Sequence, residues 1–157
     1  MKAFLKLCIV MMLISNNVRA QTAAKTVYVE IGGPGLASVN YDMRLQKKED
    51  GIGFRVGLGG FAVNGESVVF VPLGLTYLIG KDERNYFELG GGVTLVSTSE
   101  KSLQPSDNFA TTFGHLYFGY RMQPKNGGFL FRAGITPVFN KEGFIPYYAG
   151  ISFGYKF

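Results

Sequence analysis

The last eleven residues of this 157-residue chain alternate between apolar side chains and small or polar ones. The apolar positions are Tyr147, Ala149, Ile151, Phe153, Tyr155 and Phe157. Because successive side chains of a β-strand point to opposite faces, one face of this segment is apolar up to its last residue. Such an aromatic end is typical of a strand that closes an outer-membrane barrel, where aromatic rings lie at the lipid headgroups. The segment therefore predicts the closing strand of a membrane barrel.

Residues 1–20 have the organisation of a secretory signal. Its basic start contains Lys2 and Lys6, and its apolar core is residues 7–14. The predicted cleavage sequence is Val18-Arg19-Ala20. The core is too short to cross a bilayer as a helix, which needs about 20 apolar residues. Cys8 lies inside the core without small residues before it, which argues against a lipoprotein signal. We therefore expect a signal peptide at residues 1–20 and an outer-membrane β-barrel domain at residues 21–157.

The segment after the predicted signal has little net charge and no cysteine. Loss of Lys2, Lys6 and Arg19 lowers the formal charge from +5 to +2, with 13 basic against 11 acidic residues. Without a cluster of Lys and Arg, the segment lacks the electrostatic footprint of a nucleic-acid-binding protein. The lack of cysteine excludes a disulfide framework and a thiolate metal site. We expect no nucleic-acid partner, no cofactor and no metal.

Eight segments of the chain alternate with period two, and turn-forming residues separate them. They are residues 25–33, 36–46, 52–62, 67–79, 85–96, 111–122, 128–139 and 147–157. A glycine count of 22 and an aromatic content of 15% favour strands and turns over helices. Tilted strands of about 9 to 11 residues cross a bilayer. The pattern predicts an all-β fold, an eight-stranded antiparallel up-and-down transmembrane β-barrel.

Charged residues within these segments are few, of both signs, and separated by glycines. They are Glu30, Asp42, Arg44, Arg55, Glu88, Arg121 and Arg132. A face exposed to water would be about a quarter to a third charged, with lysine prominent, whereas the lysines here gather in the expected turns. An eight-stranded barrel is wide enough only for side chains to fill it. We therefore predict an interior charge network of Arg–carboxylate pairs and a filled polar interior rather than an open pore.

An even number of strands places both termini on the same side of the membrane, which we expect to be the periplasm. Short charged connections are predicted to be periplasmic turns at residues 47–51, 80–84 and 124–127. External connections are predicted at residues 32–35, 63–66, 97–110 and 140–143, and the longest of them is the expected contact region. Towards this external rim we place the residues Pro34, Pro72, Pro137 and Pro146, with an outer aromatic girdle of Phe61, Phe113, Phe139 and Tyr147.

His115 is the one histidine of the chain and is a candidate catalytic residue. Catalysis by histidine requires an oriented nucleophile or a carboxylate within hydrogen-bonding reach. Ser152 and Glu88 belong to the same side of the predicted sheet, but their spacing does not place them beside His115. The His-x-Ser pattern of outer-membrane lipid A deacylases is absent, because Leu116-Tyr117 follows His115. One histidine without cysteine is also a poor set of metal ligands.

Several motifs along the chain resemble a family of small outer-membrane barrel proteins common in Bacteroidetes. They are Gly32-Gly33-Pro34-Gly35-Leu36, Val39-Asn40-Tyr41-Asp42, Gly53-Phe54-Arg55-Val56-Gly57, Val71-Pro72-Leu73-Gly74, Phe129-Leu130-Phe131-Arg132-Ala133-Gly134 and Gly154-Tyr155-Lys156-Phe157. The architecture is also similar to that of the eight-stranded OmpA and OmpX type. The resemblance implies a barrel in a Gram-negative outer membrane and carries no particular activity.

The sequence thus favours an integral outer-membrane protein with a structural or surface-interaction role. The alternatives are an outer-membrane lipid-modifying enzyme and a soluble periplasmic lipid-binding barrel. The expected partners are outer-membrane lipid and lipopolysaccharide, and the barrel-assembly machinery through the closing strand that ends in Phe157. We expect a monomer with both termini in the periplasm.

Overall fold

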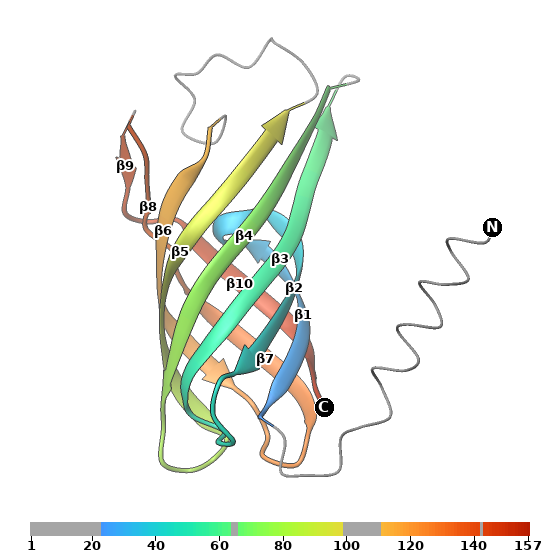
Figure 1. The fold of residues 1–157 in the computed structure, drawn as a ribbon, viewed down its shortest axis with the longest axis vertical. Coiled ribbons are helices and arrows are strands. Elements are labelled where there is room, and N and C mark those ends of the chain that lie inside the picture. The colour runs from blue at the N-terminus through green and yellow to red at the C-terminus, as the bar shows by residue number, and fades with distance from the viewer. Residues whose placement is uncertain (1–22, 64–65, 99–110, 142) are drawn as a thin grey trace, which may run out of the picture.

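A computed structural model describes residues 23–63, 66–98, 111–141 and 143–157. The predicted signal peptide and nearly all of the predicted 97–110 loop lie outside these residues. In the described part of the chain, no helix is long and apolar enough to cross a membrane. Long tilted strands make up most of the molecule (Figure 1).

Eight long antiparallel strands close into a barrel, which confirms the predicted fold class. They are β1 (Lys25–Gly32), β2 (Ala37–Arg44), β3 (Gly51–Val63), β4 (Glu66–Ile79), β5 (Asn85–Thr98), β6 (Phe113–Met122), β7 (Gly128–Ile135) and β10 (Ala149–Lys156). Each strand pairs with its neighbour in the chain, except that β7 pairs with β10. Pairing of β10 with β1 completes the ring. Both ends of the described chain lie at one end of the barrel, here called the terminal end, because Thr26 pairs with Lys156.

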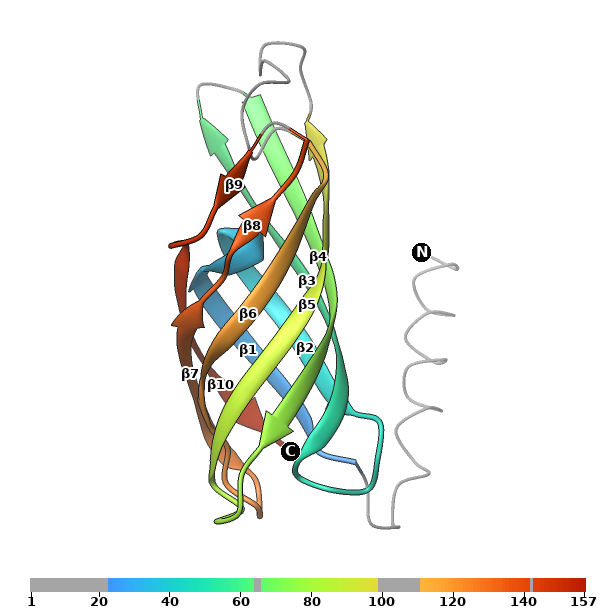
Figure 2. The same ribbon diagram turned by 90° about the vertical axis from the view of Figure 1, so that its left-hand side faces the viewer.

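The predicted seventh strand is interrupted at Thr136-Pro137 rather than continuing to Phe139. Proline has no backbone N–H to donate to a ladder, so β7 ends before it. The chain resumes as a short hairpin of β8 (Val138–Phe139) and β9 (Phe144–Ile145). β8 takes the place of β7 beside the far half of β6, and the hairpin rises above β7 and β10 (Figure 2).

Short turns close the terminal end, and their residues have the conformations that such turns require. Gly51 and Gly127 have φ angles of +81° and +83°, a region that residues with a Cβ atom rarely adopt. In the β4–β5 turn the Asp82 carboxylate accepts hydrogen bonds from the backbone N–H groups of Arg84 and Asn85, at 3.1 and 2.6 Å. These bonds and one from the Asn85 side chain lower the pKa of Asp82.

The two faces of each strand differ as the alternation predicts. Val29, Leu75 and Ile151 point outward and are between 45% and 53% exposed, although they are large aliphatic residues. Charged and polar residues that alternate with them are enclosed in the lumen. An apolar exterior around a charged interior reverses the arrangement of a soluble lipid-binding barrel, so that alternative is not supported.

The connection between β1 and β2 folds into the lumen instead of forming the predicted external turn. It forms a single 3₁₀ turn, η1 (Gly33–Gly35), whose residues are buried. η1 lies inside the barrel, well below the tips of β3–β5 (Figure 1). The Thr94 hydroxyl donates a hydrogen bond to the carbonyl of Pro34 at 3.2 Å. A side chain at Gly33 could not fit, because its Cβ would lie 2.6 Å from Cδ of Glu30.

The lumen is apolar at the loop end, opposite the terminal end, so the prediction of a polar interior holds only in part. Four buried side chains form this apolar cluster: Val68, Phe70, Phe113 and Val138. Phe113, predicted to be an outer girdle residue, points inward because it has the same strand parity as His115. Phe61, another predicted girdle residue, is 46% exposed, and its ring centroid lies 6.0 Å from that of Phe70.

Pro72 also differs from its predicted place at the external rim. It is a buried, mid-strand residue of β4, opposite Thr94 of β5. On its other side the β3–β4 ladder is interrupted between the pairs Val56–Leu73 and Gly59–Phe70. The interruption follows from the missing backbone N–H of proline.

Candidate functional site: an arginine–carboxylate network in the lumen

Six of the eight long strands contribute charged side chains to one network in the half of the lumen nearest the terminal end. The seven predicted network residues, Glu30, Asp42, Arg44, Arg55, Glu88, Arg121 and Arg132, are all buried, with exposed fractions of 0–3%. Each occupies an inward position of its strand because each alternates with outward apolar residues. The structure brings all seven into one set of ion pairs.

Asp42 is the acceptor for two of the arginines. Arg44 Nη2 lies 2.7 Å from both carboxylate oxygens of Asp42, and Arg121 Nη2 lies 3.0 Å from Oδ1. The Thr76 hydroxyl donates a further hydrogen bond to Asp42 Oδ2 at 3.0 Å. Both oxygens of the buried carboxylate therefore have donors, as a charge enclosed in a barrel requires.

Arg132 connects the other two carboxylates. Its Nε and Nη2 donate to the two oxygens of Glu88 at 2.9 and 2.8 Å, which is a forked, bidentate pair. Its Nη1 lies 3.3 Å from Glu30 Oε1. Glu30 also pairs with Arg55, whose Nε donates to Asn40 Oδ1 at 3.0 Å. Through these contacts Arg132 links strands that lie on opposite sides of the lumen.

Two aromatic rings enclose the Arg132 guanidinium. Its Cζ atom lies 4.6 Å from the ring centroid of Tyr28 and 4.6 Å from that of Tyr117. Cation–π contacts of this kind gain strength when the cation is removed from water. The planar guanidinium can stack and donate in its plane at the same time, which a lysine could not do.

Two glycines of β3 leave space for the inward side chains that pair with them on β2, Arg44 and Asn40. A Cβ atom added at Gly53 would lie 2.1 Å from Arg44 Nη2, and one added at Gly57 would lie 2.2 Å from Asn40 Oδ1. Distances this short are incompatible with the present side-chain positions. Gly53 and Gly57 thus have a packing role within their strand.

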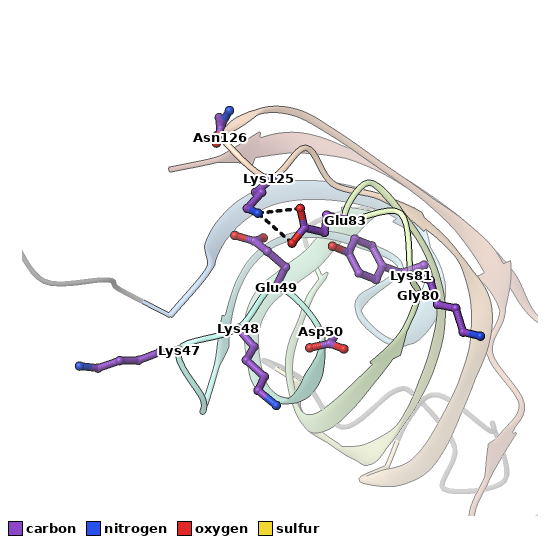
Figure 3. A pocket seen from close by; sticks show the side chains of 10 residues that line it. Lys47, Lys48, Glu49, Asp50, Gly80, Lys81, Glu83, Lys125 and Asn126 are labelled. Atoms are coloured by element: carbon purple, nitrogen blue, oxygen red, sulfur yellow. Dashed lines mark hydrogen bonds and ion pairs between the residues drawn. The ribbon is translucent and has the colours of Figure 1, made fainter.

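A pocket of about 570 Å³ opens at the terminal end, between the three short turns. Across it Lys125 and Glu83 form an exposed ion pair at 2.6 Å, whereas Lys47 and Lys81 point away from it (Figure 3). Tyr86 lines the pocket. The pocket is lined by charged groups of both signs.

Lys156 and Gln123 form a second polar group near this end, which the sequence analysis did not include. The Lys156 ammonium pairs with Glu49 and donates to the carbonyls of Pro124 and Lys125. Gln123 Nε2 donates to Glu49 Oε2 at 3.1 Å. Parity was the available signal, because Lys156 has the same inward parity as Ser152 on the closing strand.

His115 lies apart from this network, near the loop end. Its Nδ1 is 3.2 Å from the Thr94 hydroxyl, which also donates to the Pro34 carbonyl. Since a hydroxyl has one proton, His115 Nδ1 is the donor in this contact. Ser152 instead bonds Glu30 and Arg132, so the structure does not bring it together with His115.

Glu88, which shares the inward side of the sheet with His115, pairs instead with Arg132 and Arg121. Within the described residues, no group of three or more His, Cys, Asp or Glu side chains is arranged to hold a metal ion. The seven charged residues of the network are engaged with one another, and their ion pairs connect six strands inside the lumen.

No protein-family model and no curated protein matches the chain, whereas solved structures do. The N-terminal β-barrel domain of Pseudomonas aeruginosa OprF matches with a TM-score of 0.58 at 11% identity, over 86% of this chain and 96% of that one. The Yersinia pestis outer membrane protein Ail matches with a TM-score of 0.54 at 9% identity, over 86% and 99%. The fold is that of a small outer-membrane β-barrel. The outer membrane enzyme PagL is more distant, with a TM-score of 0.43 at 12% identity over 83% and 96%.

Proposed function

We propose that this protein is an integral outer-membrane barrel with a closed lumen and a structural or surface-interaction role. The observation that carries the proposal is the filled interior beneath an apolar exterior. The Glu88–Arg132–Glu30 contacts and the Arg121–Asp42 pair cross the lumen where a conducting barrel would hold water. Opening a path would separate buried ion pairs, at a cost of several kcal/mol for each ion left unpaired.

Location in the membrane is supported by the outward residues. Aromatic side chains surround the terminal end at Phe54, Tyr77, Phe87, Tyr120, Phe129, Tyr155 and Phe157, each of them at least 38% exposed. Aromatic residues are enriched where a membrane protein passes from hydrocarbon to headgroups. Between this girdle and the loop end the outward positions are mainly aliphatic, which suits contact with acyl chains.

We propose that the terminal end faces the periplasm, because its connections are short and outer-membrane barrels have short periplasmic turns. The expected partners are lipid and lipopolysaccharide around the barrel. A further partner is the barrel-assembly machinery, which would bind the closing strand that ends in Phe157. A monomer is expected, since the closed ring satisfies both edges of its long strands through most of its height.

A closed lumen predicts that the protein does not conduct ions. Residues 21–157, refolded into planar bilayers, should give no unitary current steps, because side chains fill the cross-section. Refolding of the same sample is checked by its shift in migration between heated and unheated gel lanes. Unitary steps from a sample that is fully folded on the gel would contradict the closed-lumen proposal.

A further inference from the structure

The wall of the barrel differs greatly in height between its two sides. The strands β1, β2, β7 and β10 have eight residues each, whereas β4 and β5 have 14. With a rise of about 3.4 Å per residue and a tilt of about 40°, the low side spans about 18 Å and the high side about 34 Å. The apolar band of an outer-membrane barrel is about 25 Å tall. The eight-residue strands alone are therefore too short to cover the hydrocarbon layer. The β8–β9 hairpin extends the wall above β7 and β10, whereas no strand lies above β1 and β2.

Above the low side the hydrogen-bonded wall stops. The last pairs on β2 and β10 are Ser38–Gly59 and Ala149–Ile135. From Gly60 onward β3 pairs with β4 alone, and β9 has β8 as its one neighbour in the sheet. The unpaired edge of β3 and the unpaired edge of β9 thus border the space above β1 and β2. The strands β3–β6 continue upward beside this space (Figure 1).

Two partly buried residues come from the connections next to this space, Leu36 from β1–β2 and Tyr148 from β9–β10. Leu36 and Tyr148, both partly buried, pack against the apolar cluster of Val68, Phe70, Phe113 and Val138. Leu36 has a φ angle of +58°, which is uncommon for a residue with a branched side chain. The chain therefore accepts an unfavourable backbone conformation at the residue that covers the cluster.

The margin of this region is continuous with the outward apolar surface of the barrel. Ile31 at the top of β1, Val39 at the start of β2 and Phe144 of β9 are between 55% and 63% exposed. These three residues carry no charge, so nothing at these positions favours water over hydrocarbon. Exposed apolar surface of this kind marks a contact site.

We propose that acyl chains of a membrane lipid cover this region and pack against Leu36 and Tyr148 above β1 and β2. The proposal rests on the membrane insertion proposed above. A lipid chain suits the site because the region is apolar, is continuous with the lipid-facing surface, and lies at a depth where the bilayer is still hydrocarbon. In this arrangement lipid approaches the apolar cluster from one side of the barrel only, the side above β1 and β2.

The test uses tryptophan fluorescence, because the chain has no tryptophan of its own. Single variants Leu36→Trp, Tyr148→Trp and Phe144→Trp are refolded into vesicles of phosphatidylcholine with brominated acyl chains. Phe144→Trp alters an exposed side chain and is the variant least prone to disturb folding. All three should lose as much fluorescence as Leu75→Trp, an outward position on the high side.

The enclosed control is Tyr86→Trp, which should not be quenched by brominated lipid because Tyr86 is buried inside the barrel. Quenching of Leu36→Trp and Tyr148→Trp by aqueous iodide, or by neither agent, would overturn the lipid contact. If Leu75→Trp is itself unquenched, membrane insertion is wrong instead. The two failures are therefore distinguishable.

Discussion

Replacing Arg132 with methionine should lower the free energy of unfolding by about 3 to 5 kcal/mol, because it leaves buried carboxylates without their partner. Glu88 loses both short hydrogen bonds and keeps only Arg121, whose Nη1 is 3.7 Å away. Glu30 also loses one of its ion pairs. The measurement is urea unfolding in detergent micelles, followed by circular dichroism and by the gel shift.

The matched control is Lys125→Met, which breaks the Lys125–Glu83 pair at 2.6 Å. Both of its side chains are 56% exposed, so the loss should be about 1 kcal/mol or less. Adding Glu88→Gln to Arg132→Met should recover part of the loss, since one unpaired charge is removed. If Arg132→Met and Lys125→Met cost the same, the network does not hold the barrel together.

Replacing Leu75 with arginine should cost about 2 to 4 kcal/mol, as a basic residue does near the bilayer midplane. Leu75 is the tenth of the 14 residues of β4, four residues from its terminal-end residue Ile79, and its side chain is 52% exposed on the outer face. Unfolding is measured by titration with denaturant in lipid vesicles, where the hydrocarbon layer is present. The effect arises because the guanidinium has no polar partner on that face.

The same strand supplies the control for this substitution. Ile79→Arg is on the same face at the terminal end, where its position next to the aromatic girdle allows the guanidinium to reach the headgroups. A cost of about 0 to 1 kcal/mol is expected there. Equal costs at Leu75 and Ile79 would show that the outer face of β4 does not cross a hydrocarbon layer.

The alternation of side chains was enough to predict the ring of strands and the inward direction of the charged residues. A period of two residues determines which face of the strand a residue occupies. Seven buried charges would destabilise the barrel strongly unless they formed ion pairs with one another. Which arginine meets which carboxylate was not predictable. Arg121 reaches Asp42 across the lumen, and this depends on the register between strands that are distant in the sequence.

Other features could not be predicted from the sequence because they arise from tertiary contacts. The sequence Gly33-Pro34-Gly35 is typical of an external turn. It is buried because the Thr94 hydroxyl donates a hydrogen bond to the Pro34 carbonyl and because Gly33 packs beside the Glu30 side chain. The sequence analysis places Phe113 in the outer girdle, whereas the parity it shares with His115 places it inside. Pro137 was expected near the rim, but the resulting exchange of β7 for β8 beside β6 could not be read from one residue.

The central claim is that the apolar face of each strand touches lipid and the charged face is enclosed. Residues 21–157 contain no cysteine, so single cysteines at positions 69–79 of β4 can each carry a nitroxide label in vesicles. Collision with oxygen, which concentrates in hydrocarbon, should peak at every second position, at Val69, Val71, Leu73, Leu75, Tyr77 and Ile79. A pattern with the opposite phase, or labels at Val71, Leu73 and Leu75 that collide mainly with a water-soluble nickel complex, would contradict the claim.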